Sequence, residues 1–173
     1  MIHDASNDST HGATRASQDV EKNDNDSSMA ILERASTRAR QEGVSYQGLV
    51  TPAEAQALVQ AGIATIVDVR TRFEAAYVGR IPGSPLVEWK ALGAADPNPR
   101  FVEQLDALPD KRENLLFLCR SGVRSHAAAA AATEAGHGHA FNILEGFEGD
   151  LDDDQHRGAR GGWRKAGLPW IQS

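Results

Sequence analysis

The chain has 173 residues, 40% of them hydrophobic, and a formal net charge of −6. This length and apolar content predict one core domain with at most a small appendage, and the acidic balance argues against nucleic acid or an anionic membrane surface as a partner. We expect neither a membrane span nor a signal peptide, because no apolar run is long enough to cross a bilayer and the first residues are polar and acidic.

The N-terminal part of the chain changes character at Met29. Residues 1–28 are rich in Ser, Asn, Asp and Thr and poor in large apolar side chains, which predicts a disordered acidic tail. Residues 29–43 are predicted as a helix that stops at Gly43. The folded domain is therefore expected over residues 44–173.

The first half of this domain contains two clear helix starts. Thr51-Pro52-Ala53-Glu54 and Thr71-Arg72-Phe73-Glu74 each have the pattern of a capping box, in which a Thr and a Glu satisfy the first free backbone N–H groups of a helix. Three apolar runs between and around these helices are predicted as strands: Val44–Tyr46 as a short edge strand, Ala64–Val69, and Leu86–Trp89.

The second half continues the alternation of helices and strands. We predict a helix over Arg100–Leu108, a buried strand over Leu115–Leu118, a helix around the alanine run Ala127–Ala132, and a last strand over Ala140–Leu144. Such alternation predicts an α/β fold of three layers, α/β/α, with a mainly parallel central sheet of about five strands. In such sheets ligands bind beyond the carboxyl ends of the strands.

The stretch that follows the Leu115–Leu118 strand combines a thiol with an anion cradle. Cys119, the only cysteine, directly follows the strand, and a helix begins a few residues later. A loop between a buried strand and a helix turns its N–H groups inward, where they and the helix dipole attract an anion. A thiol there should favour its nucleophilic thiolate form. We predict Cys119 as the catalytic nucleophile and, as substrate-binding residues, Arg120, Ser121, Gly122, Val123, Arg124 and Ser125.

The side chains of this loop support the functional interpretation over a structural one. A lone cysteine after an apolar strand is more often a small buried hydrophobe than a nucleophile. Here Arg120 and Arg124 add positive charge that can guide an anion, and Ser125 adds a hydroxyl donor. Gly122 permits a backbone turn that other residues resist. These features favour the nucleophile.

Asp68 and Arg70 end the predicted Ala64–Val69 strand, so they should lie at the same edge of the sheet as Cys119. We predict both as site-supporting residues. Asp68 can either fix the catalytic loop through hydrogen bonds or cap the turn that follows it. The spacing of Arg70 and Glu74 predicts an i, i+4 ion pair.

The histidines and the acidic cluster are weaker candidates for catalytic or metal-binding residues. His126 is predicted as an ordinary first-turn helix residue whose side chain leans away from the loop, rather than a base for Cys119. His137 and His139 lack companions at ligand spacing, and Asp150–Asp154 resembles a calcium loop but lacks its glycine and its final glutamate. With one cysteine the chain can form neither an internal disulfide nor a cysteine-based zinc site. We therefore predict no metal.

Two stretches resemble one known family. Cys119-Arg120-Ser121-Gly122-Val123-Arg124 is similar to the active-site loop of the rhodanese (thiosulfate sulfurtransferase) family, of the bacterial single-domain type. Asp68–Glu74 followed by Gly79–Ser84 is similar to the upstream signature of that family, with Ala75 in place of an aromatic residue and Arg80 in place of a histidine. The resemblance covers roughly residues 44 to 170, including the ending Gly161–Trp170.

The resemblance implies a rhodanese-like fold and a sulfurtransferase that works through a cysteine persulfide without metal or organic cofactor. The donor would be thiosulfate or a similar small anion, and the acceptor cyanide, a cellular thiol or a protein. Because no second cysteine is present, an outside acceptor must discharge the persulfide. A free thiol suits the reducing cytoplasm.

Two alternatives stay open. One is a phosphatase or arsenate reductase on the same fold, since phosphatase loops of the Cys-x5-Arg type resemble this one. That type needs an arginine six positions after the cysteine, where this chain has Ser125, and Arg124 stands one position earlier. The shorter loop suits one sulfur atom better than a phosphate group. The other alternative is a non-enzymatic module that relays or senses sulfur.

Overall fold

A computed structural model of the protein describes residues 11–109 and 111–172. Its centre is a sheet of four parallel strands in the order β1-β4-β3-β2. The strands are β1 (Gly48–Val50), β2 (Ala64–Asp68), β3 (Asn114–Leu118) and β4 (Ala140–Ile143). Strand β3 lies between β4 and β2, with Leu116 opposite both Phe141 and Ile66. The residue that follows β3 is therefore near the middle of the carboxyl edge.

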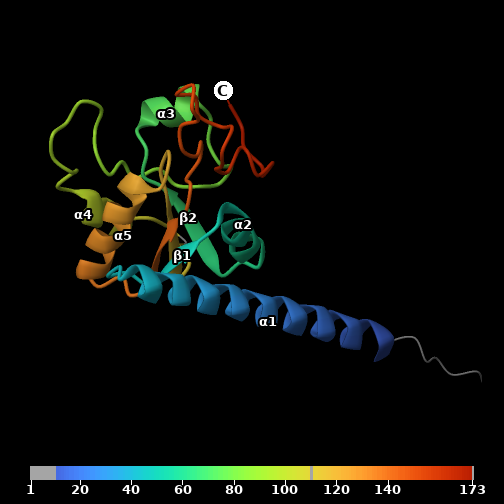
Figure 1. The fold of residues 1–173 in the computed structure, drawn as a ribbon. Helices are drawn as coiled ribbons and strands as arrows, with labels where there is room; N and C mark the ends of the chain where they lie inside the picture. Colours follow the sequence, from blue (N-terminus) through green and yellow to red (C-terminus); the bar gives the residue numbers. More distant parts are fainter. Residues whose placement is uncertain (1–10, 110, 173) are drawn as a thin grey trace, which may run out of the picture.

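Helices cover both faces of the sheet and produce the three layers predicted from the sequence (Figure 1). Helices α1 (His11–Glu42) and α2 (Pro52–Gln60) pack on one face, and α4 (Phe101–Asp106) and α5 (Val123–Glu134) pack on the other. The short helix α3 (Arg72–Tyr77) lies beyond the carboxyl ends of the strands (Figure 1). The expected three-layer α/β/α fold is confirmed.

Strand β3 is apolar along its whole length because both of its faces are buried. Leu116 and Leu118 face the core under α1 and α2, whereas Leu115 and Phe117 face the core under α4 and α5. Successive side chains of a strand point to opposite faces, so this run of leucine and phenylalanine fills both cores. Cys119 continues the alternation and belongs to the second core.

Both predicted capping boxes are present. The Thr51 hydroxyl accepts a hydrogen bond from the N–H of Glu54, whose carboxylate accepts one from the N–H of Thr51 at 3.0 Å. Thr71 and Glu74 repeat the same exchange at the start of α3. These local signals therefore set where α2 and α3 begin.

Two predicted strands differ from the structure. The first strand forms at Gly48–Val50 rather than at Val44–Tyr46, because its pairing partner is β4, at the register of Gly48 with Phe141. The segment predicted as a strand at Leu86–Trp89 makes an isolated bridge between Leu86 and Asp68. This segment does bond to the chain at the end of β2, since the Val87 and Trp89 N–H groups donate to the Asp68 and Val69 carbonyls, but the pairing is confined to that end. Apolar content alone does not reveal where pairing occurs.

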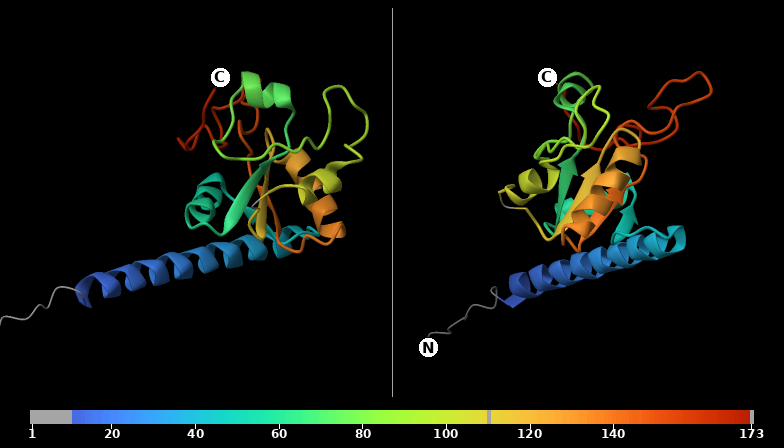
Figure 2. Two further views of the ribbon diagram at one scale, coloured as in Figure 1. Left: turned by 180° about the vertical axis from the view of Figure 1, so that it is seen from behind. Right: turned by 90° about the vertical axis from the view of Figure 1, so that its left-hand side faces the viewer.

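Helix α1 begins at His11, whereas residues 1–28 were predicted as a disordered tail and the helix as residues 29–43. The first ten residues of that tail lie outside the described part. A packed helix extends at little cost once nucleated, and the added segment contains no proline. The two views in Figure 2 show its N-terminal half projecting away from the sheet. None of the helices in the described part is long and apolar enough to cross a membrane.

Arg38 fastens α1 to the domain. Its guanidinium donates to the Leu49 carbonyl at 2.9 Å and to both carboxylate oxygens of Glu54, at 2.6 and 2.9 Å. Burial alone raises the pKa of Glu54, but the hydrogen bonds from Arg38 and from the Thr51 N–H outweigh it and lower the pKa to about 2. Glu54 therefore serves the capping box and the α1 contact together.

We predict that Arg38→Ala lowers the free energy of unfolding by about 1 to 2 kcal/mol, because it leaves a half-buried carboxylate and a carbonyl without their donor. Arg34→Ala is the matched control on the same helix, since Arg34 is more exposed and makes one contact of 3.3 Å with Glu54. Its effect should stay below about 0.5 kcal/mol. Urea unfolding measures both, and equal effects would show that the Arg38 contacts do not fasten the helix.

Candidate active site

Cys119 lies buried at the carboxyl end of β3, where the backbone turns into α5. Its Sγ accepts two hydrogen bonds, one from the backbone N–H of Gly122 and one from the hydroxyl of Ser125, both at 3.2 Å. Ser125 is itself fully buried. Both donors present positive hydrogen to the sulfur, which is the polarity that an anionic sulfur requires.

Gly122 makes the tight turn possible. It stands at the N-cap of α5 with a φ of +92°, in the left-handed region that glycine adopts without strain. The side-chain amide of Asn142, on β4, donates to the Gly122 carbonyl at 3.2 Å. Because the carbonyl and the next N–H of a trans peptide point in opposite directions, this bond directs the Val123 N–H away from Asn142. The helix N-terminus adds a positive partial charge at the same point.

The back of the loop rests on the segment that follows β4. The N–H groups of Phe147 and Glu148 donate to the carbonyls of Cys119 and Arg120 at 2.8 and 2.9 Å. Gly146, with a φ of +62°, lies so close that an added Cβ would be 2.5 Å from the Cys119 carbonyl oxygen. The close approach of these two backbones therefore requires glycine at this position.

Gly146 and Asn142 were not among the residues predicted from the sequence. A glycine soon after a strand, at the ligand-binding edge of a parallel sheet, is the signal that could have identified Gly146. Asn142 interrupts the apolar run of β4 with a buried polar side chain, which needs a partner. The polar residue within an apolar run could have identified Asn142 as well, but it does not reveal that the partner is the Gly122 carbonyl.

Arg124, predicted as a substrate-binding residue, pairs with Glu74 on α3. Its guanidinium donates to the two carboxylate oxygens of Glu74 at 2.6 and 2.8 Å. Burial raises the pKa of Glu74, but the hydrogen bonds from Arg124 and from the Thr71 N–H outweigh it and lower the pKa to about 2. The hydrogen bond to Glu74 raises the pKa of Arg124.

The predicted ion pair between Arg70 and Glu74 is wrong. Arg70 is fully buried and pairs with Asp68 at 2.6 Å, while it also donates to the Gly79 carbonyl at 2.8 Å. The i, i+4 rule holds inside a helix, and Arg70 precedes the start of α3. Asp68 accepts from the Arg70 N–H, so it caps this turn, and among the described residues its carboxylate accepts no hydrogen bond from the Cys119 loop.

The remaining predicted residues surround the sulfur at different depths. Arg120 and Val123 are exposed on the outside of the loop, and Ser121 is half-buried. The ring of His126 turns away from Cys119, because its Nδ1 shares a hydrogen bond of 2.8 Å with the Tyr46 hydroxyl. The loop thus presents its backbone to the sulfur and most of its side chains to solvent or to neighbouring elements.

This geometry suits a nucleophilic sulfur that carries or receives negative charge. One buried thiol lies at a helix N-terminus with a backbone and a hydroxyl donor beside it, and a guanidinium lies nearby. The described part of the chain contains no group of three or more His, Cys, Asp or Glu side chains arranged to hold a metal.

A comparison with known protein families identifies the architecture. The family model described as "Rhodanese-like domain" matches residues 51–152, which include β2, β3, β4 and the Cys119 loop. The "Uncharacterized protein RP600 homolog" of Rickettsia rickettsii is 34% identical over 129 residues, which cover 73% of this chain and 98% of that protein. The similarity therefore extends over almost the whole length of that relative.

Two further proteins are similar. The "Thiosulfate sulfurtransferase/rhodanese-like domain-containing protein 3" of Mus musculus is 32% identical over 110 residues, which cover 62% of this chain and 66% of that protein. The crystal structure of Rv0390 from M. tuberculosis superposes with a TM-score of 0.66 and 42% identity, and covers 75% of this chain and 100% of that one.

Replacing Gly146 should damage the site through its backbone. We predict that Gly146→Ala destabilises the protein and abolishes most reactivity of Cys119 towards a thiol reagent in the folded state, because the new methyl group forces the loop away from its support. Gly167→Ala is the matched control, since Gly167 has a similar φ of +70° but open space around it. If both variants lose the same stability and reactivity, backbone strain alone accounts for the effect.

The Glu74–Arg124 pair predicts a defined pH dependence. In the unfolded chain the pKa of Glu74 returns to about 4.5, whereas it is about 2 in the folded protein. The stabilisation from this pair is therefore complete above pH 4.5 and is lost as the pH falls towards 2. Urea midpoints measured across this range should fall less steeply for Glu74→Gln than for the wild type, and parallel curves would contradict the assignment.

Proposed function

This chain belongs to the rhodanese-like domain family, and on that premise we propose that it is a sulfurtransferase that carries a sulfane sulfur on Cys119. The observation that carries the proposal is the buried Cys119 Sγ with the Gly122 N–H and the Ser125 hydroxyl both 3.2 Å away. The printed name of the mouse relative, which includes thiosulfate sulfurtransferase, is consistent with it.

In the first half-reaction the Cys119 thiolate attacks the outer sulfur of thiosulfate or a similar anionic donor. A new sulfur–sulfur bond forms at Sγ, the sulfur–sulfur bond of the donor breaks, and sulfite leaves with the bonding electron pair. The exposed Arg120 guides the anion towards the loop. We assign this role to Arg120 because the guanidinium of Arg124 is occupied by Glu74.

The persulfide then needs donors for its outer sulfur. The loop around Gly122 and the N-terminus of α5 provide them, since a helix N-terminus favours an anion through its free N–H groups and dipole. The Ser125 hydroxyl stays with Sγ and steadies it as the outer sulfur is gained or lost. The fold holds these donors in place, so they need little reorientation when charge moves onto or off the sulfur.

In the second half-reaction an external nucleophile removes the sulfur. Cyanide attacks the outer sulfur, the persulfide bond breaks, and thiocyanate and the Cys119 thiolate form; a thiol acceptor would become a persulfide in the same way. No second cysteine exists to resolve the intermediate internally. We place this chemistry in the cytoplasm, because a free nucleophilic thiol persists in a reducing compartment.

A phosphatase or arsenate reductase is disfavoured by the position of Arg124. Phosphoryl transfer needs a bidentate arginine for the charged oxygens, and here that guanidinium already binds a carboxylate with both of its arms. A non-enzymatic sulfur relay would use the same loop and differs from an enzyme only in turnover.

Turnover therefore tests the proposal. The full-length protein should convert thiosulfate and cyanide to sulfite and thiocyanate catalytically, and Cys119→Ser should form none above background. It should not hydrolyse p-nitrophenyl phosphate at a comparable rate. Phosphatase activity that depends on Cys119 would favour the other enzyme class, and a persulfide that forms without turnover would favour the relay.

Ser125→Ala tests the hydroxyl beside the sulfur. A hydrogen bond to a charged group contributes roughly 1.5 to 3 kcal/mol, so kcat/KM for thiosulfate should fall about tenfold or more. Thr133→Val is the control on the same helix, because the Thr133 hydroxyl bonds to the Ala129 carbonyl and lies away from the loop. A kcat/KM for Ser125→Ala within about twofold of the wild type would remove this residue from the mechanism.

A further inference from the structure

A cleft that includes Arg120 and Arg124 of the Cys119 loop carries more positive charge than the chain as a whole. It lies beside the catalytic loop and is lined by residues that follow β2 and β3 and by the segment after Phe147. Its charged side chains are the cations Lys90, Arg120, Arg124 and Arg157 and the carboxylates Glu74 and Glu148. The cleft is thus net positive in a chain whose net charge is −6.

Two of these cations are available to a partner. Arg124 is neutralised by Glu74, and Arg157 donates to the Gly149 carbonyl at 2.6 Å. Among the described residues, however, no hydrogen bond or ion pair joins the side chains of Lys90 and Arg120 to a neighbour. An approaching anionic group can therefore displace water from them without breaking an internal contact.

The rim of the cleft is apolar as well as charged. Phe73 on α3 and Leu92 in the segment after Trp89 are 52% and 77% exposed, and Leu151 borders the cleft from the other side. Large apolar side chains at the edge of a charged cleft are typical of protein-binding surfaces. A small anion would use the cations and leave these side chains in water.

We propose that this cleft docks an acidic, thiol-bearing segment of a partner protein, which takes the sulfur from Cys119; the proposal rests on the sulfurtransferase function. Acidic groups of the segment face Lys90 and Arg120, and an apolar residue packs against Leu92. The thiolate of the partner attacks the outer sulfur, a new sulfur–sulfur bond forms on the partner, and Cys119 leaves as its thiolate. Because the chain has one cysteine, the thiol that takes the sulfur must come from another molecule, and a partner segment can supply it.

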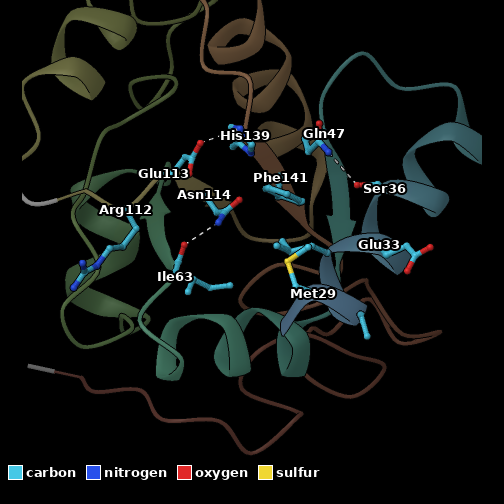
Figure 3. Close-up of a pocket in the computed structure, with 12 residues that line it drawn as sticks. Met29, Glu33, Ser36, Gln47, Ile63, Arg112, Glu113, Asn114, His139 and Phe141 are labelled. Carbon is cyan, nitrogen blue, oxygen red and sulfur yellow. Dashed lines mark hydrogen bonds and ion pairs between the residues drawn. The ribbon is translucent and has the colours of Figure 1, made fainter. Parts of the chain in front are cut away.

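The opposite edge of the sheet provides matched control residues. A second pocket there, shown in Figure 3, is lined by residues at the amino ends of β3 and β4 and by α1. It presents Arg112, an exposed cation, and Met29, which is 61% exposed. Substitutions at these two positions change the charge or the apolar surface of the protein equally, but far from Cys119.

The experiment measures sulfur transfer from the full-length protein after loading with thiosulfate. The acceptors are a synthetic cysteine peptide flanked by Glu and Leu, the same peptide with Lys in place of Glu, and mercaptosuccinate, a small dicarboxylate thiol. We expect the acidic peptide to react at least about tenfold faster than the basic one. The advantage should shrink as salt is added, and mercaptosuccinate should react more slowly than the acidic peptide.

Four substitutions test whether the cleft causes the preference for the acidic peptide. Lys90→Glu should lose most of the preference for the acidic peptide, while Arg112→Glu, with the same change in net charge, should retain it. Leu92→Ser should slow transfer to the acidic peptide but not to mercaptosuccinate, and Met29→Ser should slow neither. Turnover with cyanide should stay within about twofold of the wild type in Arg112→Glu, Leu92→Ser and Met29→Ser, and Lys90→Glu should still transfer sulfur to the basic peptide, which shows that all four variants remain folded and competent.

Three results would overturn the docking proposal: equal rates for the two peptides, equal behaviour of Lys90→Glu and Arg112→Glu, or mercaptosuccinate reacting as fast as the acidic peptide. The last would assign the cleft to a small anionic thiol. Absence of cyanide turnover in the wild type is a different result, since it would reject the sulfurtransferase function itself.

Discussion

The candidate site depends on two backbone hydrogen bonds at the back of the Cys119 loop. The carbonyls of Cys119 and Arg120 accept from Phe147 and Glu148, so the outer side of the loop is satisfied by protein. The segment can approach this closely because Gly146 has no side chain. With these carbonyls engaged outward, the N–H of Gly122, the N-cap of α5, remains directed at the sulfur. The anion cradle is thus a consequence of how the chain after β4 packs.

The same constraint links the rest of the domain to the site. Asn142 on β4 binds the Gly122 carbonyl, and Phe147 lies 4.1 Å below the Arg70 guanidinium, measured to its ring centre. Arg70 in turn holds Asp68 and the Gly79 carbonyl. A continuous set of contacts therefore joins the ends of β2, β3 and β4 around Cys119. The reactive group is mobile only if several of these contacts break together.

Features encoded by neighbouring residues could be predicted from the sequence, and features that depend on distant residues could not. The two capping boxes, the apolar run of β3 and the position of Cys119 at a strand end all follow from short stretches. Glu74 and Arg124 are 50 residues apart, so their pairing requires knowledge of how β2 and β3 align. The prediction that joined Arg70 to Glu74 applied helical spacing to a residue outside the helix. The role of Gly146 was missed for a related reason: the glycine itself is the only sign in the sequence of a close contact between two backbones.

The central claim is that Cys119 carries the transferred sulfur, and mass spectrometry tests it most directly. The full-length protein is incubated with thiosulfate, freed of excess reagent and measured intact, and the adduct is then mapped by digestion. The account predicts a gain of one sulfur atom, located on the peptide that contains Cys119, and no gain for Cys119→Ser. An adduct on another residue, or thiocyanate formation by a protein whose Cys119 never gains sulfur, would contradict it.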